Sequence, residues 1–312
     1  MDFVQQVKEG NKVAIARLIT KAENEAPEAT AALRELYPYT GRAYLIGITG
    51  PPGSGKSTLT DKLVKEIRKR GKTAGVIAVD PSSPFTGGAI LGDRIRMSDL
   101  ALDEGVFIRS MSARGNLGGL ARATQDTVKI LDAAGYEYIF IETVGVGQSE
   151  IDIVKTADST VVVSVPGLGD DIQAIKAGIM EIGDLFVVNK ADKDGAEKVV
   201  IELSQMLELN NEMGNWYPPI LKTIAPINEG IVELMDKIIE HFNYLIDSGE
   251  LQKRRKERIS NEIISLILKK VSVKINSKLG VKDFWESELS EILAKEKNPY
   301  DFVDKIAREI LV

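Results

Sequence analysis

The fold of this chain is indicated most clearly by residues 43–57, AYLIGITGPPGSGKS. The first seven of these residues are nearly all apolar or β-branched, which predicts a buried strand. The last eight match the pattern G-x-x-x-x-G-K-[ST], and residues 57–70 continue with helical periodicity. A strand, this loop and then a helix is the context in which such a sequence binds phosphate groups. A glycine-rich stretch that only makes a turn is the alternative.

Each residue type in this loop has a chemical role in phosphate binding. Glycines let the backbone curl so that successive N–H groups face an anion. The lysine is expected to reach the β- and γ-phosphates, and the serine hydroxyl is a ligand for Mg²⁺. The expected nucleotide contacts are Gly50, Pro51, Pro52, Gly53, Ser54, Gly55, Lys56, Ser57 and Thr58.

Strand-like and helical segments alternate through the middle of the chain. Such alternation implies a mostly parallel sheet with right-handed crossovers. The strands are expected at 43–49, 74–79, 106–108, 138–141, 160–165, 185–188 and 220–224, and the helices between them at 57–70, 119–134, 172–182 and 196–209. The fold class predicted is α/β, a phosphate-loop NTPase domain with a helical N-terminal segment and a helical C-terminal extension.

The flanking segments have no strand signal. Helices are predicted at 231–246, 251–273 and 285–294, and Asn298-Pro299 is a helix-starting pair. We therefore expect a helical segment at 1–40, the nucleotide-binding domain at 41–247 and a helical extension at 248–312.

Composition excludes several classes of site. The 312 residues include no cysteine and one histidine, which excludes disulfides, thiolate zinc sites, iron–sulfur clusters and cysteine nucleophiles. That histidine, His241, is expected to be a packing or helix-surface residue. With 40 basic and 46 acidic residues the formal charge is −6, so no nucleic-acid partner is expected. No apolar run suits a membrane span, and a cytoplasmic protein is expected.

A second motif predicts which base is bound. Asn189, Lys190 and Asp192 form N-K-x-D at the end of an apolar strand. A carboxylate can accept from both N1–H and the amino group of guanine, whereas adenine presents an acceptor at N1. Asn189 is expected to brace the loops and the Lys190 stem to cover the base. Backbone contacts to the guanine oxygen are expected from Thr223, Ile224 and Ala225. An ordinary polar turn is the alternative.

Acids at strand ends are candidate magnesium ligands, directly or through water. They are Asp80, Asp93 and Glu142, which join Ser57 in the expected metal set. Capping of the next turn is the alternative for each acid. Glu142 and Gly145 also occupy the ends of a D-x-x-G-like segment, where a glycine amide senses the γ-phosphate. The residues expected to act in catalysis are Lys56, Glu142 and Gly145, with no certain general base or arginine finger.

Together these blocks resemble one family. IETVGVGQSE (141–150), VDPSSPFTGGAILGDRIRM (79–97) and GGLARAT (118–124) look like the methylmalonyl-CoA mutase-associated GTPases of the MeaB/ArgK type, over roughly residues 40–312. The resemblance implies a GTPase chaperone of an adenosylcobalamin-dependent acyl-CoA mutase, which gates cofactor loading and protects the mutase. It also implies the metal roles above, a switch at 144–150, a partner-sensing loop near 167–176, and a homodimer formed through the C-terminal helices.

Two rival functions share parts of this pattern. A metal-insertion GTPase needs Cys or His to hold its metal and is disfavoured by this composition. A kinase acting on a transport-system binding protein is not excluded by the motifs, although no separate acceptor base is evident.

Overall fold

The computed structural model describes residues 3–80, 97–112, 117–143, 156–167, 183–209, 215–279 and 282–311. Two compact units are distinguished, Met1–Leu251 and Gln252–Val312. The expected helix at 172–182 lies outside the described residues. Within the described part of the chain, every helix is too short or too polar to cross a bilayer.

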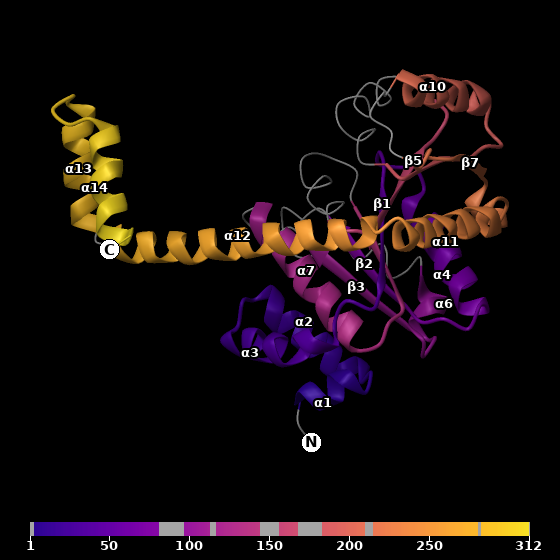
Figure 1. Cartoon of the computed structure of the whole chain (residues 1–312), viewed down its shortest axis with the longest axis horizontal. Helices are drawn as coiled ribbons and strands as arrows, with labels where there is room; N and C mark the ends of the chain where they lie inside the picture. The colour runs from indigo at the N-terminus through magenta and orange to yellow at the C-terminus, as the bar shows by residue number, and fades with distance from the viewer. Residues whose placement is uncertain are drawn as a thin grey trace. The chain divides into compact units, whose positions relative to one another are not determined.

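The first unit is built on a seven-stranded sheet (Figure 1). Its order is β3-β2-β4-β1-β5-β6-β7, and every strand pairing in it is parallel. The parallel α/β fold is thus confirmed. The strands are β1 (Tyr44–Thr49), β2 (Ala74–Asp80), β3 (Val106–Ser112), β4 (Tyr138–Glu142), β5 (Ser159–Ser164), β6 (Leu185–Asn189) and β7 (Ile220–Thr223).

Strand β3 is longer than the sequence predicts. The apolar run stops at Ile108, but the strand continues to Ser112 because each of its residues pairs with one of β2. A neighbouring strand supplies hydrogen bonds that do not depend on side-chain polarity.

Helices cover both faces of the sheet, as a parallel sheet requires. Alternate strand residues point to opposite sides, so Ile46 and Ile48 join one core cluster and Leu45 joins another. On the first side lie α4 (Lys56–Lys69), α6 (Ser98–Ala101) and α11 (Ile231–Asp247). The helices on the second side are α1 (Phe3–Lys8), α2 (Lys12–Glu23), α3 (Pro27–Leu36), α7 (Leu117–Ala133) and α10 (Ala196–Leu209).

Local sequence signals explain where the N-terminal helices begin. The Asn11 side chain accepts hydrogen bonds from the Val13 and Ala14 amides and so caps α2. Pro27 opens α3 at the first helical position. The buried faces of these helices join the core cluster that also contains α7 residues, which confirms the expected helical N-terminal segment.

The C-terminal extension is helical, as predicted. It comprises α12 (Glu250–Leu279), α13 (Lys282–Leu293) and α14 (Pro299–Leu311). Asn298 caps α14 by accepting from the Tyr300 amide. Helix α12 passes the expected end at residue 273, since no glycine or proline interrupts the chain before Gly280.

Candidate nucleotide-binding site

The glycine-rich loop joins β1 to α4 and has a backbone that only glycine tolerates. Gly50, Gly53 and Gly55 have φ angles of 142°, 75° and 88°. A Cβ on Gly50 would lie 2.1 Å from the Val163 carbonyl oxygen, and one on Gly55 would lie 2.5 Å from Nδ2 of Asn189. The loop is therefore packed closely against β5 and the end of β6.

Lys56 is the first residue of α4 and its side chain reaches back across the loop. The buried ammonium donates to the carbonyl oxygens of Gly50 at 2.6 Å and Pro51 at 2.9 Å. These bonds place a positive charge at the helix N-terminus, where amide dipoles also favour an anion.

Ser57 and Glu142 are in direct contact. The Ser57 hydroxyl donates to Oε1 of Glu142 at 2.5 Å, and Glu142 is buried at the end of β4, next to β1 in the sheet. Oε2 of the same carboxylate lies 3.1 Å from the Thr60 hydroxyl. Two residues of the expected metal set thus lie together, while the structure does not describe the side chain of Asp80. Asp93 and Gly145 lie outside the described residues.

This pair of oxygens fits a magnesium ion. A hydroxyl and a carboxylate are hard ligands, and Mg²⁺ usually takes only one or two protein oxygens alongside water and substrate phosphates. Among the residues described here, no three His, Asp or Glu side chains gather closely enough to hold a metal by themselves. The site therefore suits an ion carried in with a nucleotide.

Asn189, at the end of β6, links three segments. Its Nδ2 donates to the Ser54 carbonyl at 2.9 Å, and its Oδ1 accepts from the Thr223 hydroxyl at 3.1 Å and the Ala225 amide at 3.3 Å. The next residue, Lys190, donates from Nζ to the Gly53 carbonyl at 2.7 Å. The N-K-x-D segment is thus bonded to the phosphate loop.

The residues expected to read the base lie around these bonds. Asp192 is exposed and follows the turn that Lys190 begins with a left-handed φ of 56°. The Ile224 amide already donates to the Glu229 carbonyl, and the Ala225 amide to Asn189. Contacts from residues 223–225 to a base are therefore still a prediction.

Thr60 is the polar residue near this site that the sequence reasoning missed. It follows Ser57 by three residues on α4, a spacing that puts both hydroxyls on one helix face. This spacing of two hydroxyl side chains is the feature of the sequence that could have identified Thr60.

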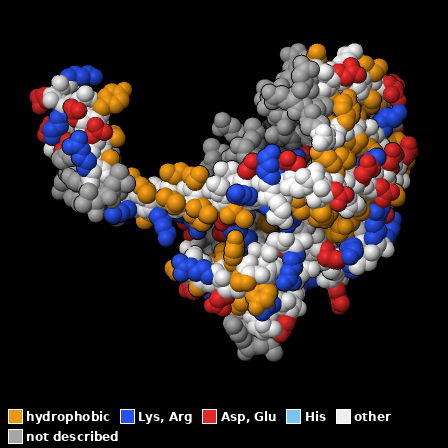
Figure 2. Space-filling model, viewed as in Figure 1, with side chains coloured by type: hydrophobic (Ala, Val, Ile, Leu, Met, Phe, Trp, Pro, Cys, Tyr) orange, Lys and Arg blue, Asp and Glu red, His pale blue; other side chains and the backbone are white. Residues whose placement is uncertain are grey.

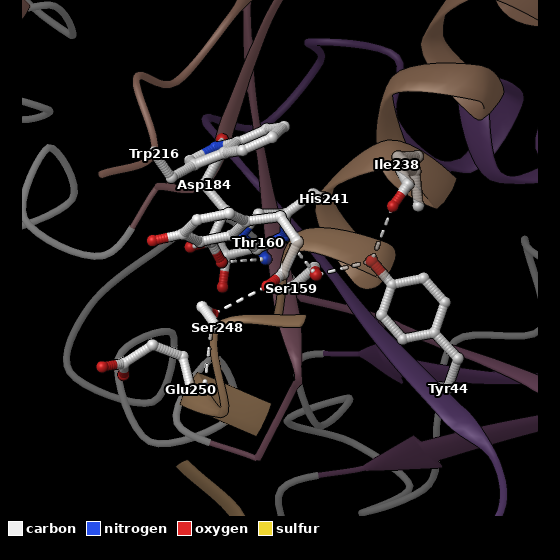
Figure 3. Close-up of polar contacts among 10 residues, drawn as sticks. Tyr44, Ser159, Thr160, Asp184, Trp216, Ile238, His241, Ser248 and Glu250 are labelled. Atoms are coloured by element: carbon white, nitrogen blue, oxygen red, sulfur yellow. Dashed lines mark hydrogen bonds and ion pairs between the residues drawn. The ribbon is translucent and has the colours of Figure 1, made fainter. Parts of the chain in front are cut away.

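A second polar cluster lies at the amino ends of the strands (Figure 3). The Tyr44 hydroxyl lies 2.5 Å from Oγ of Ser159, which in turn is 2.6 Å from Nδ1 of His241. Nε2 of His241 is 3.4 Å from Oδ1 of Asp184. Burial raises the pKa of Tyr44 well above its usual value.

This amino-end cluster (Tyr44, Ser159, Asp184 and His241) is sealed. His241 and Ser159 have no exposed surface. The Trp216 ring packs against the imidazole, with 4.7 Å between the two ring centroids. The expectation that His241 is a packing residue is confirmed, and the helix-surface alternative is wrong. Serine, histidine and aspartate lie near one another here, but within the described part of the chain Ser159 and His241 present no surface to a substrate.

The model of one protein family matches most of the chain. Described as "Methylmalonyl Co-A mutase-associated GTPase MeaB", it aligns with residues 15–279. The chain belongs to the MeaB family. The resemblance drawn from the motifs is thus confirmed, and the chain is a GTPase of the MeaB/ArgK type.

Relatives of this MeaB-family chain align over most of its length. A Pyrococcus abyssi protein named as a candidate GTPase is 52% identical and covers 99% of this chain and 96% of its own length. The GTPase ArgK of Escherichia coli is 38% identical, covering 82% of this chain and 80% of its own. A crystal structure of an "LAO/AO transport system kinase" superposes with a TM-score of 0.75 at 27% identity, over 99% of this chain and 97% of that one.

Proposed function

We propose that this GTPase binds Mg²⁺-GTP at the carboxyl ends of β1, β4 and β6 and serves an adenosylcobalamin-dependent acyl-CoA mutase. Its role is that of a cytoplasmic chaperone that gates cofactor loading and protects the mutase from inactivation. The observation that best supports the nucleotide site is the bonding of Asn189 and Lys190 to carbonyls of the phosphate loop. A base held by the N-K-x-D segment would then lie beside phosphates held by the loop. The family description supports the mutase partner.

Each residue has a distinct part in this proposal. Lys56 exchanges its bonds to loop carbonyls for bonds to the β- and γ-phosphates. Ser57 and Glu142 hold the ion, which when bound neutralises charge on the transferring phosphoryl group. Asp192 selects guanine. The γ-phosphate sensor proposed at Gly145 and the switch at 144–150 lie outside the described residues.

Hydrolysis in this site depends on positioning and charge rather than on an acid–base pair. Phosphoryl transfer needs aligned phosphates and neutralised oxygens, which the loop amides, Lys56 and the ion supply. With no general base among the residues described around Lys56 and Glu142, we propose slow turnover alone and acceleration by the mutase.

We also propose a homodimer through the C-terminal extension. Helix α12 carries exposed aliphatic side chains, which run along it in Figure 2. An exposed apolar stripe of this kind on a helix is typical of a protein interface. The residues are Ile259, Ile263, Ile264, Ile267 and Leu268.

The chaperone proposal is tested with a purified B12-dependent mutase from the same source. We expect the mutase to raise the GTP hydrolysis rate, and the GTPase with GTP to extend the active lifetime of the mutase. The Lys56→Ala variant is the control and should give neither effect. A pair that shows no binding and no change in either rate contradicts the proposal.

The kinase alternative has one supporting observation, the name of the structurally similar protein. It is tested by following label from γ-³²P-GTP. Label on inorganic phosphate supports hydrolysis, and stoichiometric label on a co-purified binding protein would favour the kinase.

A further inference from the structure

Thr60 connects the phosphate-loop helix to the carboxylate proposed to hold magnesium. It is fully buried, and its hydroxyl lies 3.1 Å from Oε2 of Glu142 and 2.9 Å from the Lys56 carbonyl oxygen. We propose that Thr60 is a positioning residue for the magnesium site, fixing the orientation in which Glu142 meets Ser57. This inference rests on the proposed Mg²⁺-dependent function.

Two hydroxyl groups of α4 hold the Glu142 carboxylate. Ser57 and Thr60 lie one turn apart on α4, and each hydroxyl bonds a different oxygen of Glu142. A single hydrogen bond fixes the position of one oxygen but allows the group to rotate about it. Two bonds from one rigid helix fix both oxygens, so the plane of the carboxylate is set before an ion arrives.

The Thr60 hydroxyl has one proton and two acceptors within reach. The Lys56 carbonyl is part of α4, where an amide four residues on is its regular partner. The carboxylate is buried, and when ionised it forms the stronger, charge-assisted bond. An ionised Glu142 is therefore the preferred acceptor, although the Lys56 carbonyl oxygen lies closer to the hydroxyl, at 2.9 Å against 3.1 Å.

Loss of the Thr60 hydroxyl is expected to weaken the binding of Mg²⁺ more than the binding of the nucleotide. Ser57 must offer a lone pair to Mg²⁺ while its hydroxyl continues to donate a hydrogen bond to Oε1 of Glu142. If Thr60 no longer held Oε2, the carboxylate could turn away from Ser57. Lys56 and Asn189 bond the loop from other directions, so contacts to phosphate and base would persist without Thr60.

The experiment compares three variants of the full-length protein. Thr60→Val removes the hydroxyl and keeps the shape of the side chain. Thr60→Ser retains a hydroxyl and removes only the methyl group. Thr127→Val is the matched control, since Thr127 is fully buried on α7 and its hydroxyl donates to the Ala123 carbonyl four residues back at 2.7 Å. That change removes a buried helical hydroxyl of the same kind far from any carboxylate of the site.

The measurement is the Mg²⁺ concentration that gives half-maximal retention of a fluorescent GDP analogue, with GDP affinity in EDTA alongside. We expect roughly tenfold more Mg²⁺ to be needed by Thr60→Val, the effect of one hydrogen bond to a charged group. Thr60→Ser and Thr127→Val should stay within about twofold of the parent, and affinity in EDTA should be equal in all four proteins.

Three results would overturn the inference. The first is a Thr60→Val protein with an unchanged Mg²⁺ requirement. The second is a loss of GDP affinity in EDTA as large as the loss with Mg²⁺, which would show a structural role alone. The third is a parent protein whose GDP binding does not depend on Mg²⁺, and only this one also contradicts the proposed function. If Thr60→Val does not fold, Thr60→Ala removes the same hydroxyl without a branched side chain and is judged by the same criteria.

Discussion

Two buried polar clusters lie at opposite ends of the same parallel sheet. The carboxyl-end cluster (Ser57, Thr60, Glu142 and Asn189) adjoins a curled glycine loop. The amino-end cluster is closed over by α11 and Trp216. Both are well hydrogen-bonded, and the amino-end cluster even includes a serine, a histidine and an aspartate.

Suitable residue types do not make a binding site by themselves. In an open parallel sheet, ligands bind outside the carboxyl ends of the strands, where loops and helix N-termini converge. There the loop carbonyls of Gly53 and Ser54 are tied to the base motif, and Asp192 is exposed. At the other end, His241 of α11 contacts Ser159 of β5 and Asp184, which precedes β6, and it has no access to solvent.

The largest expected effect is at the carboxyl-end site. Lys56→Ala should weaken GTP binding roughly a hundredfold or more, because the phosphates lose a buried cation. Lys69→Ala, near the other end of α4 and exposed, is the control and should bind GTP normally. Equilibrium titration with a fluorescent nucleotide measures both, and equal affinities would contradict the loop assignment.

A second effect of similar size is on stability and belongs to the amino-end cluster. His241→Ala should lower the free energy of unfolding by about 3 kcal/mol, since it opens a cavity and removes the imidazole that contacts Ser159 and Asp184. Urea unfolding measures this, with the exposed neighbour Glu240→Ala as the control. The folded variant should bind GTP as the parent does, and a selective loss of GTP binding would show that the two clusters are not separate.

Base selection gives a smaller effect. Asp192→Asn should reduce GTP affinity by about 2 kcal/mol, because an amide presents a donor where the carboxylate accepts from guanine. Xanthosine nucleotides should then be preferred, which competition binding reveals. Survival of the guanine preference over xanthine would show that Asp192 does not read the base.

The smallest effect is a pH dependence. Because burial raises the pKa of Tyr44, the phenol stays neutral in the folded chain above pH 10 while its unfolded form ionises. Stability is therefore full below about pH 10 and falls above it, by about 1.4 kcal/mol per pH unit for each such group. Burial also raises the pKa of Tyr136, to about 12, so that residue adds to the slope.

Tyr44→Phe should remove the Tyr44 share of this slope. Unfolding in urea at pH 9, 10 and 11 measures it, with Tyr136→Phe as a matched comparison. The same alkaline slope in Tyr44→Phe as in the parent would mean that Tyr44 ionises normally in the folded protein.

The sequence predicted the sheet and its helices because local signals agreed with the tertiary fold. Continuous apolar runs, the glycine loop and the Asn298-Pro299 start each act over a few residues. The extension of β3 to Ser112 depends on pairing with β2, which no local pattern reports. The structure likewise brings Ser57 to Glu142 across 85 positions of the chain, which only the sheet order explains.

The amino-end cluster could not be predicted for a related reason. Tyr44 lies in β1, Ser159 in β5 and His241 in α11, while Asp184 directly precedes β6, so these residues meet only in the folded chain. His241 follows two apolar residues on a helix, a pattern that fits either a packed or an exposed position. Its burial comes from the packing of α11 against β5 and of the Trp216 ring against the imidazole. The Trp216 indole N–H also donates to the Asp184 carbonyl.

The central claim is that the carboxyl-end site binds a magnesium-bound guanine nucleotide. Calorimetric titration of the purified protein with GTP and with ATP, each in the presence of Mg²⁺, tests it most directly. We expect saturable binding of one GTP per chain and at least a hundredfold weaker binding of ATP. Equal affinity for the two nucleotides, or no heat with either, would contradict it.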